Sequence, residues 1–197
     1  MIRTILWPLA AILATLFANV AFAKDEVRPK RDEKKATPAN ESEFAKQHKQ
    51  FVAAINKADK TALLEGLPSE WEHGLLAEEL KTKKTVKHFK YPFYSNPLPL
   101  TEKDKKALLA LAVAKNSLPE LLEEHLCGGF HPDYCIEWHV GKDIYYCLIC
   151  FGCHEAELYG PKIVLHCDLP DAAYDSFKKI LMQYRRERPE SKSKESK

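Results

Sequence analysis

The predicted fold depends on residues 127–168, which read CGGFHPDYCIEWHVGKDIYYCLICFGCHEAELYGPKIVLHCD. The same stretch contains the residues that are candidates for a functional site. Apolar and polar residues alternate over 134–140 and again over 163–169, as in strands that bury one face. Gly141-Lys142-Asp143 and Gly160-Pro161 supply the turns. The stretch therefore predicts a three-stranded antiparallel meander. It also contains all six cysteines of the protein: Cys127, Cys135, Cys147, Cys150, Cys153 and Cys167.

The middle strand of this meander is predicted to run from Ile144 to Tyr159, with an interruption at Gly152. In a regular strand, the thiols of Cys150 and Cys153 would face opposite sides of the sheet. We expect a bulge at Phe151-Gly152, which shifts the alternation and brings both thiols to one side. Pairing across the two turns then gathers a cluster at one end of the sheet. Its predicted members are Cys127, Cys135, Cys150, Cys153 and Cys167.

Two structural roles fit such a cluster. In an exported protein the thiols can form disulfides, and each disulfide stabilises a domain by roughly 2–4 kcal/mol. Alternatively, the thiolates can bind zinc, which takes four sulfur or nitrogen ligands in tetrahedral geometry. The candidate additional metal ligands are His131, His139 and His166. The sequence leaves the choice between disulfide and metal open.

Two redox roles fit the same residues. Cys150, Cys153 and His154 form a literal Cys-x-x-Cys-His motif, in which two thioethers and an imidazole would hold haem c in an electron carrier. The same Cys-x-x-Cys pair would also suit a redox-active dithiol. Both remain alternatives to the structural roles.

The chain upstream of residue 127 is predicted to be mainly helical. Asn40 and Glu43 suggest a capping box at the start of the first helix, and Thr101 and Asp104 suggest another one. A short strand near Lys84 leads into a proline-rich crossover. The helices are predicted from about residue 40, over 59–66, 69–83, 101–116 and 118–126, and after Pro170.

The ends of the chain suggest export. Residues 1–23 resemble a signal peptide in composition, with Arg3 before an apolar run and Ala21-Phe22-Ala23 before a cleavage site at Lys24. A membrane anchor is the alternative, but the apolar run is shorter than the ~20 residues that a span needs. Residues 24–40 are predicted to be a disordered charged linker, and 187–197 a disordered tail. We therefore expect a periplasmic or secreted protein without a membrane span after cleavage.

The charge balance and the missing motifs narrow the function. The formal net charge is +2, so no basic excess argues for nucleic acid. The sequence contains no Gly-x-Ser-x-Gly, no His-Glu-x-x-His and no phosphate-binding glycine loop. It also indicates no clear small-molecule substrate. We therefore expect a non-catalytic protein.

Several segments carry a resemblance to a known group. Gly128–Tyr134 (GGFHPDY) and Ile149–Cys153 (ICFGC) resemble segments of a family of small exported bacterial proteins of uncharacterised function. Glu65–Pro68, followed by Trp71, and Pro92–Tyr94 look like its upstream signatures. The resemblance covers about residues 60 to 185. It implies that the two halves form one unit, and it implies no activity and no catalytic residue.

Together these observations predict one α+β domain over residues 41–186. A mainly helical N-terminal half (41–126) packs on the three-stranded antiparallel meander, which a C-terminal helix closes (127–186). The expected function is that of an exported protein whose cysteine cluster stabilises the fold by disulfides or a bound metal.

Overall fold

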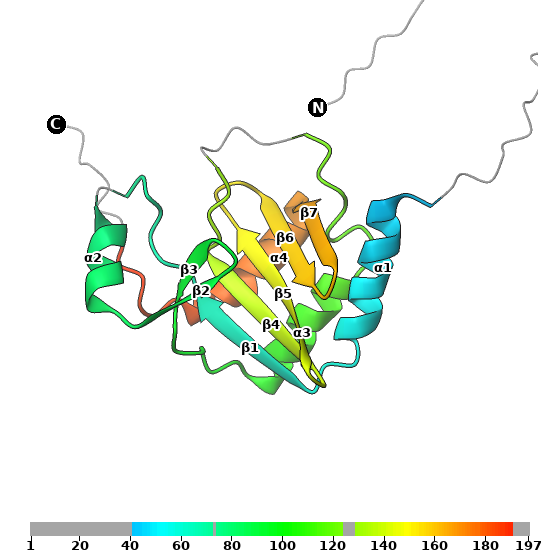
Figure 1. Ribbon diagram of the computed structural model, residues 1–197, viewed down its shortest axis with the longest axis horizontal. Helices are drawn as coiled ribbons and strands as arrows, with labels where there is room; N and C mark the ends of the chain where they lie inside the picture. Colours follow the sequence, from blue (N-terminus) through cyan, green and yellow to red (C-terminus); the bar gives the residue numbers. More distant parts are fainter. Residues whose placement is uncertain (1–40, 73, 124–128, 191–197) are drawn as a thin grey trace, which may run out of the picture. The chain divides into compact units, whose positions relative to one another are not determined.

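The computed structural model describes residues 41–72, 74–123 and 129–190 (Figure 1). These residues contain four α-helices, a five-stranded antiparallel sheet and a two-stranded sheet, so the predicted α+β class is confirmed. Within the same ranges, no helix is both long and apolar enough to cross a membrane. The predicted signal peptide, the predicted linker up to residue 40 and Cys127 lie outside the described residues.

The main sheet has the strand order β1-β4-β5-β6-β7, and every neighbouring pair is antiparallel. Strands β4 to β7 pair in chain order, and β1 adds to the free edge of β4. The expected number of three strands is therefore wrong. The strands are β1 (Lys60–Glu65), β4 (Tyr134–Val140), β5 (Asp143–Cys150), β6 (Glu155–Gly160) and β7 (Ile163–Asp168).

One of the two additional strands arises at Gly152. Residues 151–154 form a turn, after which the chain reverses and Glu155 pairs with Cys150. The predicted long middle strand is thus the hairpin β5–β6, and the expected bulge is a chain reversal. His154 closes the turn with φ +57°, a left-handed conformation that suits a tight reversal.

The other additional strand is β1, where the sequence predicted a helix over 59–66. Ala62, Leu63 and Leu64 are all buried, because β1 is covered on both faces of the sheet. Leu63 packs in the core cluster of the helices, and Leu64 packs in the cluster under the β2–β3 hairpin. A strand buried on both sides has a continuous apolar run without alternation, so it lacks the period that identifies a strand.

Three helices cover one face of the sheet (Figure 1): α1 (Glu43–Ile55), α3 (Glu102–Val113) and α4 (Asp171–Leu181), which continues into the short η1 (Met182–Tyr184). Side chains of Ser42 and Thr101 cap α1 and α3 by accepting the N–H groups of Ala45 and Asp104. The cap at Thr101 was predicted, whereas the first helix is capped by Ser42 and not by Asn40. The core on this side includes Phe51, Leu108, Ile136, Trp138, Leu158 and Phe177.

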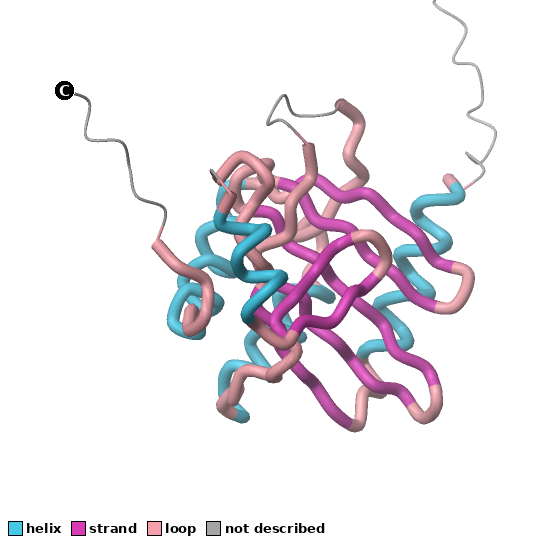
Figure 2. Tube along the Cα trace, turned by 60° about the vertical axis from the view of Figure 1, so that its left-hand side comes forward, coloured by secondary structure: helices cyan, strands magenta, loops and turns pink. Residues whose placement is uncertain are grey.

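The opposite face of the sheet carries a smaller layer. The hairpin of β2 (Thr85–His88) and β3 (Tyr91–Tyr94) packs over it and can be followed in Figure 2. It replaces the predicted strand and irregular crossover. Helix α2 (Leu75–Thr82) precedes it and is shorter than the predicted 69–83. The buried residues under the hairpin are Leu64, Tyr91, Phe93, Cys135 and Leu148.

Candidate functional site

The sheet register separates the cysteines that the sequence predicted to cluster. Cys135 pairs with Leu148 and lies in the cluster under the β2–β3 hairpin. Cys167 pairs with Ala156 and lies, with Cys147, in the core beneath the helices. Cys135 and Cys167 therefore occupy opposite faces of the sheet, and neither lies beside Cys150 in the register. No disulfide joins any of the described cysteines to another.

Cys150 and Cys153 are brought together by the turn between β5 and β6. Cys150 is the last residue of β5, and its Sγ accepts the backbone N–H of Cys153 at 3.2 Å. The thiol of Cys153 donates to the carbonyl oxygen of Gly129 at 3.3 Å. Both residues are almost fully buried, at 3% and 4% exposure. The tight turn thus fixes two neighbouring thiols at one end of the sheet.

Cys150 differs from the other buried cysteines in its surroundings. Burial raises the pKa of its thiol, whereas hydrogen bonds from the Cys153 side chain and from the backbone of His131 oppose this rise. For Cys147, burial alone raises the pKa. For Cys135, burial raises the pKa strongly, and the charge of Glu137 raises it further. Of Cys135, Cys147, Cys150 and Cys167, Cys150 is therefore the one whose pKa is held down by hydrogen bonds to its sulfur.

The two thiols line an open cleft of about 240 Å³, which we call the dithiol cleft. Trp71 stands at its wall with 74% of its surface exposed. An adjacent cleft of about 360 Å³ shares Trp71 and His131 with it and is lined further by Tyr91 and Phe130. The side chains of the dithiol cleft with acid–base, thiol or charged groups are Glu72, His131, Asp133, Cys150, Cys153 and Arg188.

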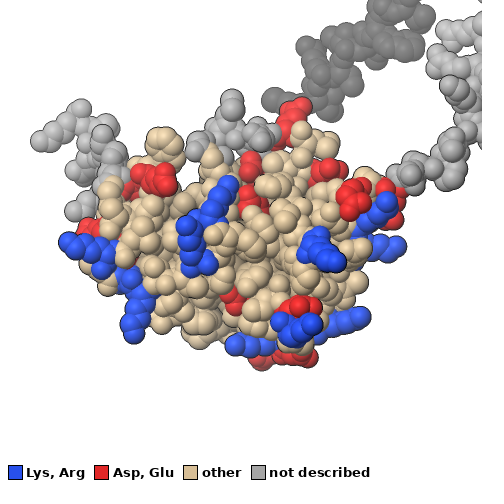
Figure 3. Space-filling view, in the orientation of Figure 1, with Lys and Arg blue, Asp and Glu red and all other residues tan. Residues whose placement is uncertain are grey.

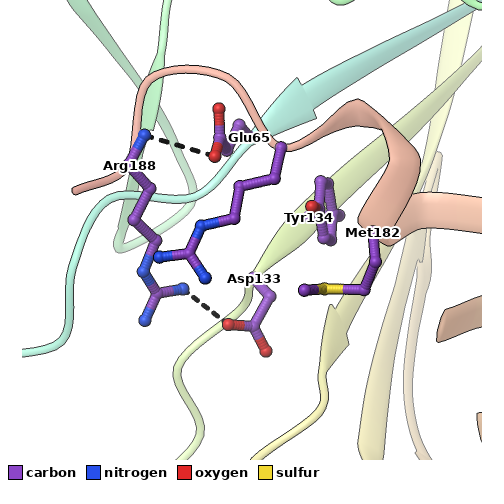
Figure 4. Close-up of a pocket in the computed structure, with 6 residues that line it drawn as sticks. Glu65, Asp133, Tyr134, Met182 and Arg188 are labelled. Atoms are coloured by element: carbon purple, nitrogen blue, oxygen red, sulfur yellow. Dashed lines mark hydrogen bonds and ion pairs between the residues drawn. The ribbon is translucent and has the colours of Figure 1, made fainter. Parts of the chain in front are cut away.

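Asp133 connects the turn to the C-terminal end of the described chain. Its Oδ2 accepts the backbone N–H of Phe151 at 2.7 Å, and its Oδ1 accepts Nη1 of Arg188 at 2.5 Å. Figure 4 shows the guanidinium group of Arg188 turned toward Asp133. Nη2 of Arg188 lies 3.0 Å from Oε2 of Glu72, which also accepts the N–H of Ser69 at 2.6 Å. Arg188 therefore lies between two carboxylates.

The chain around Arg188 is bound by a third carboxylate. Glu65, at the end of β1, is only 2% exposed and accepts the backbone N–H groups of Arg186, Glu187 and Arg188 at 3.0, 2.8 and 3.2 Å. We call residues 185–190 the C-terminal segment. The sequence assigned residues from 187 onward to a disordered tail; of these, Glu187 and Arg188 are held by these contacts, and 191–197 lie outside the described residues.

His131 also lines the dithiol cleft, as a neutral imidazole at pH 7. Burial lowers its pKa, and the charge of Arg188 lowers it further. The opposing charges of Asp133 and Glu72 do not outweigh these effects. A neutral imidazole in a cleft with two thiols can accept a proton from one of them.

The other predicted histidines lie elsewhere. Nε2 of His139 is 3.2 Å from Glu137, and Nδ1 of His166 is 3.7 Å from Glu157, both on the hairpin-covered face of the sheet. The ring of His154 stacks on Tyr174, with 4.0 Å between centroids. None of the three lines the dithiol cleft. The two thiols and the imidazole of the Cys-x-x-Cys-His motif thus do not face a common cavity, as an attached haem would require.

Metal ligation was the remaining expectation. Over residues 41–72, 74–123 and 129–190, no three His, Cys, Asp or Glu side chains are arranged to hold a metal ion. Cys127, which the sequence placed in the cluster, lies outside these residues. The zinc proposal therefore has no ligand set among the described side chains.

Three charged residues of the cleft were missed by the sequence reasoning. Asp133 stands in the GGFHPDY segment, which was interpreted only as a family marker. Glu72 and Arg188 lie in charged surroundings without a motif, and no sequence signal distinguishes them from solvated surface charges. In the view of Figure 3, basic and acidic side chains are interspersed over the face that is shown.

No protein-family model, no curated protein and no solved structure matches this chain. The resemblance carried by the GGFHPDY and ICFGC segments therefore stays an expectation.

Proposed function

We propose that the protein is exported and that Cys150 and Cys153 form a redox-active dithiol, which exchanges electrons with disulfides of other molecules. The observation that carries the proposal is the hydrogen bond from the Cys153 N–H to Sγ of Cys150, at 3.2 Å, in the wall of an open cleft. A hydrogen bond donated to sulfur stabilises the thiolate, which is the nucleophile in thiol–disulfide exchange.

The exchange involves two displacements at sulfur. The thiolate of Cys150 attacks one sulfur of a substrate disulfide; a new S–S bond forms, the old one breaks, and the released thiolate takes up a proton. Cys153 then loses its proton, for which neutral His131 is the base in the cleft, and attacks Sγ of Cys150. The second substrate thiolate leaves and is protonated. Two electrons pass from the protein dithiol to the substrate, and a Cys150–Cys153 disulfide remains.

Two other roles expected from the sequence, structural disulfides and covalent haem, have less support. Cys135 and Cys167 were expected to join Cys150, Cys153 or Cys127, but they lie on opposite faces of the sheet and neither is beside Cys150 in the register. Cys135, Cys147 and Cys167 are instead packed as small apolar side chains, each at 0% exposure. Covalent haem has less support because His154 stacks on Tyr174, away from the dithiol cleft.

A redox titration tests the proposal. The purified protein is equilibrated in buffers of reduced and oxidised dithiothreitol, quenched with acid and alkylated, and the disulfides are mapped by mass spectrometry. We expect a reversible Cys150–Cys153 disulfide that C150S and C153S both abolish. C147S is the matched control, since Cys147 lies in the core, and it should titrate like the parent. The absence of this disulfide under oxidising conditions, or a disulfide from Cys153 to another cysteine, would contradict the proposal.

Export is tested separately. Expression of the full chain in a Gram-negative host, followed by fractionation and intact-mass measurement, should give a periplasmic protein that starts at Lys24. A full-length product in the cytoplasm or the membrane fraction would rule the signal peptide out.

A further inference from the structure

We infer that Asp133 and Arg188 are a positioning pair that controls the reactivity of Cys150, and that the C-terminal segment carries this control. The inference rests on the proposed dithiol function and assigns its regulation. It gives roles to two residues that lie in the cleft but take no part in the bond changes.

Asp133 contacts the backbone of the turn that carries Cys150. One oxygen of the Asp133 carboxylate binds the N–H of Phe151, the residue next to Cys150, at 2.7 Å. The N–H of Asp133 itself donates to the carbonyl oxygen of Ile149, on the other side of Cys150, at 2.7 Å. Asp133 therefore holds the backbone on both sides of the candidate nucleophile.

Asp133 also places a negative charge close to Cys150. A carboxylate next to Cys150 disfavours its thiolate, and the charge of Asp133 indeed raises the pKa of Cys150. Arg188 places the opposite charge in the same cleft, on the second oxygen of the same carboxylate. Its side chain is only 15% exposed, so water screens this charge weakly. Arg188 therefore offsets the field of Asp133 at Sγ of Cys150.

Two glutamates hold Arg188 and its segment in place. Glu72 fixes the other side of the guanidinium group, at 3.0 Å. Glu65 fixes the backbone of the C-terminal segment through three consecutive N–H groups. The cation thus reaches the cleft on a segment that side chains, and not a helix or strand, hold in place. Displacement of this segment would remove the cation and leave Asp133 and Glu72 facing the thiols.

The pH dependence of Cys150 alkylation tests this inference. The reduced full-length protein reacts with iodoacetamide from about pH 6 to about pH 10, and peptide mapping quantifies the label on Cys150. R188Q should move the midpoint to higher pH and slow labelling near neutral pH by about threefold or more. D133N should move the midpoint to lower pH. The double variant D133N/R188Q has the same charge as the parent (−1 lost, +1 lost), so its midpoint should return toward the parent value.

Two controls separate charge from structure. R186Q removes an exposed cation from the same segment that lines neither the dithiol cleft nor the pocket beside Asp133, and its midpoint should stay unchanged. R188K keeps the charge and should restore the parent midpoint. If R188Q does not fold, D133N tests the same field with the opposite sign, because its amide oxygen can still accept the N–H of Phe151.

The inference is overturned if R188Q and D133N change only the maximal rate and not the midpoint, since a loosened segment alters access without altering charge. It is also overturned if R186Q shifts the midpoint as much as R188Q does. The outcome is independent of disulfide formation. A protein that never forms the Cys150–Cys153 disulfide but shows these shifts would refute the proposed function alone, and the converse result would refute this inference alone.

Discussion

A Cβ atom on Gly66 would lie 2.0 Å from the carbonyl oxygen of Pro132, so the two backbones meet at a distance that only glycine permits. The contact aligns the end of β1 with the segment that carries His131 and Asp133, and the N–H of Gly66 donates to the carbonyl oxygen of Asp133 at 2.7 Å. G66A should therefore destabilise the protein by about 3 kcal/mol in urea unfolding, because backbone must move. G152A is the matched control: its Cβ would meet nothing within 4 Å, and we expect a change within about 1 kcal/mol. Equal stabilities of the two variants would show that the close approach is not needed.

A second prediction concerns the hydrogen bonds between Glu65 and the C-terminal segment. E65A removes a buried carboxylate that accepts three backbone N–H groups, so it should cost about 2–4 kcal/mol in urea unfolding. Hydrogen exchange should also become faster at Arg186 to Arg188. E187A removes a more exposed carboxylate of the same segment, 26% exposed, and should cost less than about 1 kcal/mol. Unchanged exchange in E65A would disprove the anchoring.

The surroundings of the cysteines predict a clear order of reactivity. Under native conditions, Cys150 should be alkylated, because it lines the dithiol cleft and its sulfur accepts the N–H of Cys153. Cys135, Cys147 and Cys167 line no part of this cleft and are 0% exposed, so they should react only after unfolding. Mass spectrometry of native and urea-unfolded protein after brief iodoacetamide treatment measures this order. Native labelling of Cys135 or Cys167 at the rate of Cys150 would contradict the register of the sheet.

A fourth prediction concerns acid stability. Burial raises the pKa of Glu137, but hydrogen bonds from His88 and His139 and their charges outweigh this and lower it below 4.5. A carboxyl with a lowered folded pKa stabilises the protein above its unfolded pKa, and this stability is lost as the pH falls through the folded value. E137Q should therefore be less stable than the parent at pH 7, and the difference should shrink below about pH 4.5. Urea unfolding at a series of pH values measures it, and a difference that stays constant would refute the assignment.

Local patterns predicted much of the fold correctly. Strand β4 was placed at Tyr134–Val140 from its alternation alone, and the cap of α3 was placed at Thr101 from its side chain. Both features depend on residues close together in the chain. In such cases the period of burial or the chemistry of a cap is written directly in the sequence.

The errors arose where distant segments decide the local structure. Ala62 to Leu64 form a strand because β4 and the β2–β3 hairpin, which follow later in the chain, enclose them. Gly152 was compatible with a bulge or a reversal, and the pairing of Cys150 with Glu155 decides for the reversal. The reversal at Gly152 also changes which strands are neighbours, so the cysteines that were predicted to cluster lie apart.

Only part of the candidate site could be predicted from the sequence, for the same reason. Cys150 and Cys153 form a local motif, and the sequence identified them. Arg188 reaches the cleft through contacts with Asp133 and Glu72, which are far from it in the chain. A charged residue in a charged tail has no periodicity or motif, so its role appears only once the fold is known.

The bond between Glu65 and the C-terminal segment also constrains the order in which the protein can be completed. Glu65 belongs to the first of the described strands, and its three backbone partners are among the last described residues to follow. Strand β1 likewise has no partner in the main sheet until β4 has been made. A chain that is still emerging from the ribosome therefore contains an unpaired edge and an uncompensated carboxylate. Such a chain cannot complete these contacts until residues 186–188 have been released, so the first described strand is secured only after the last described helix has been made.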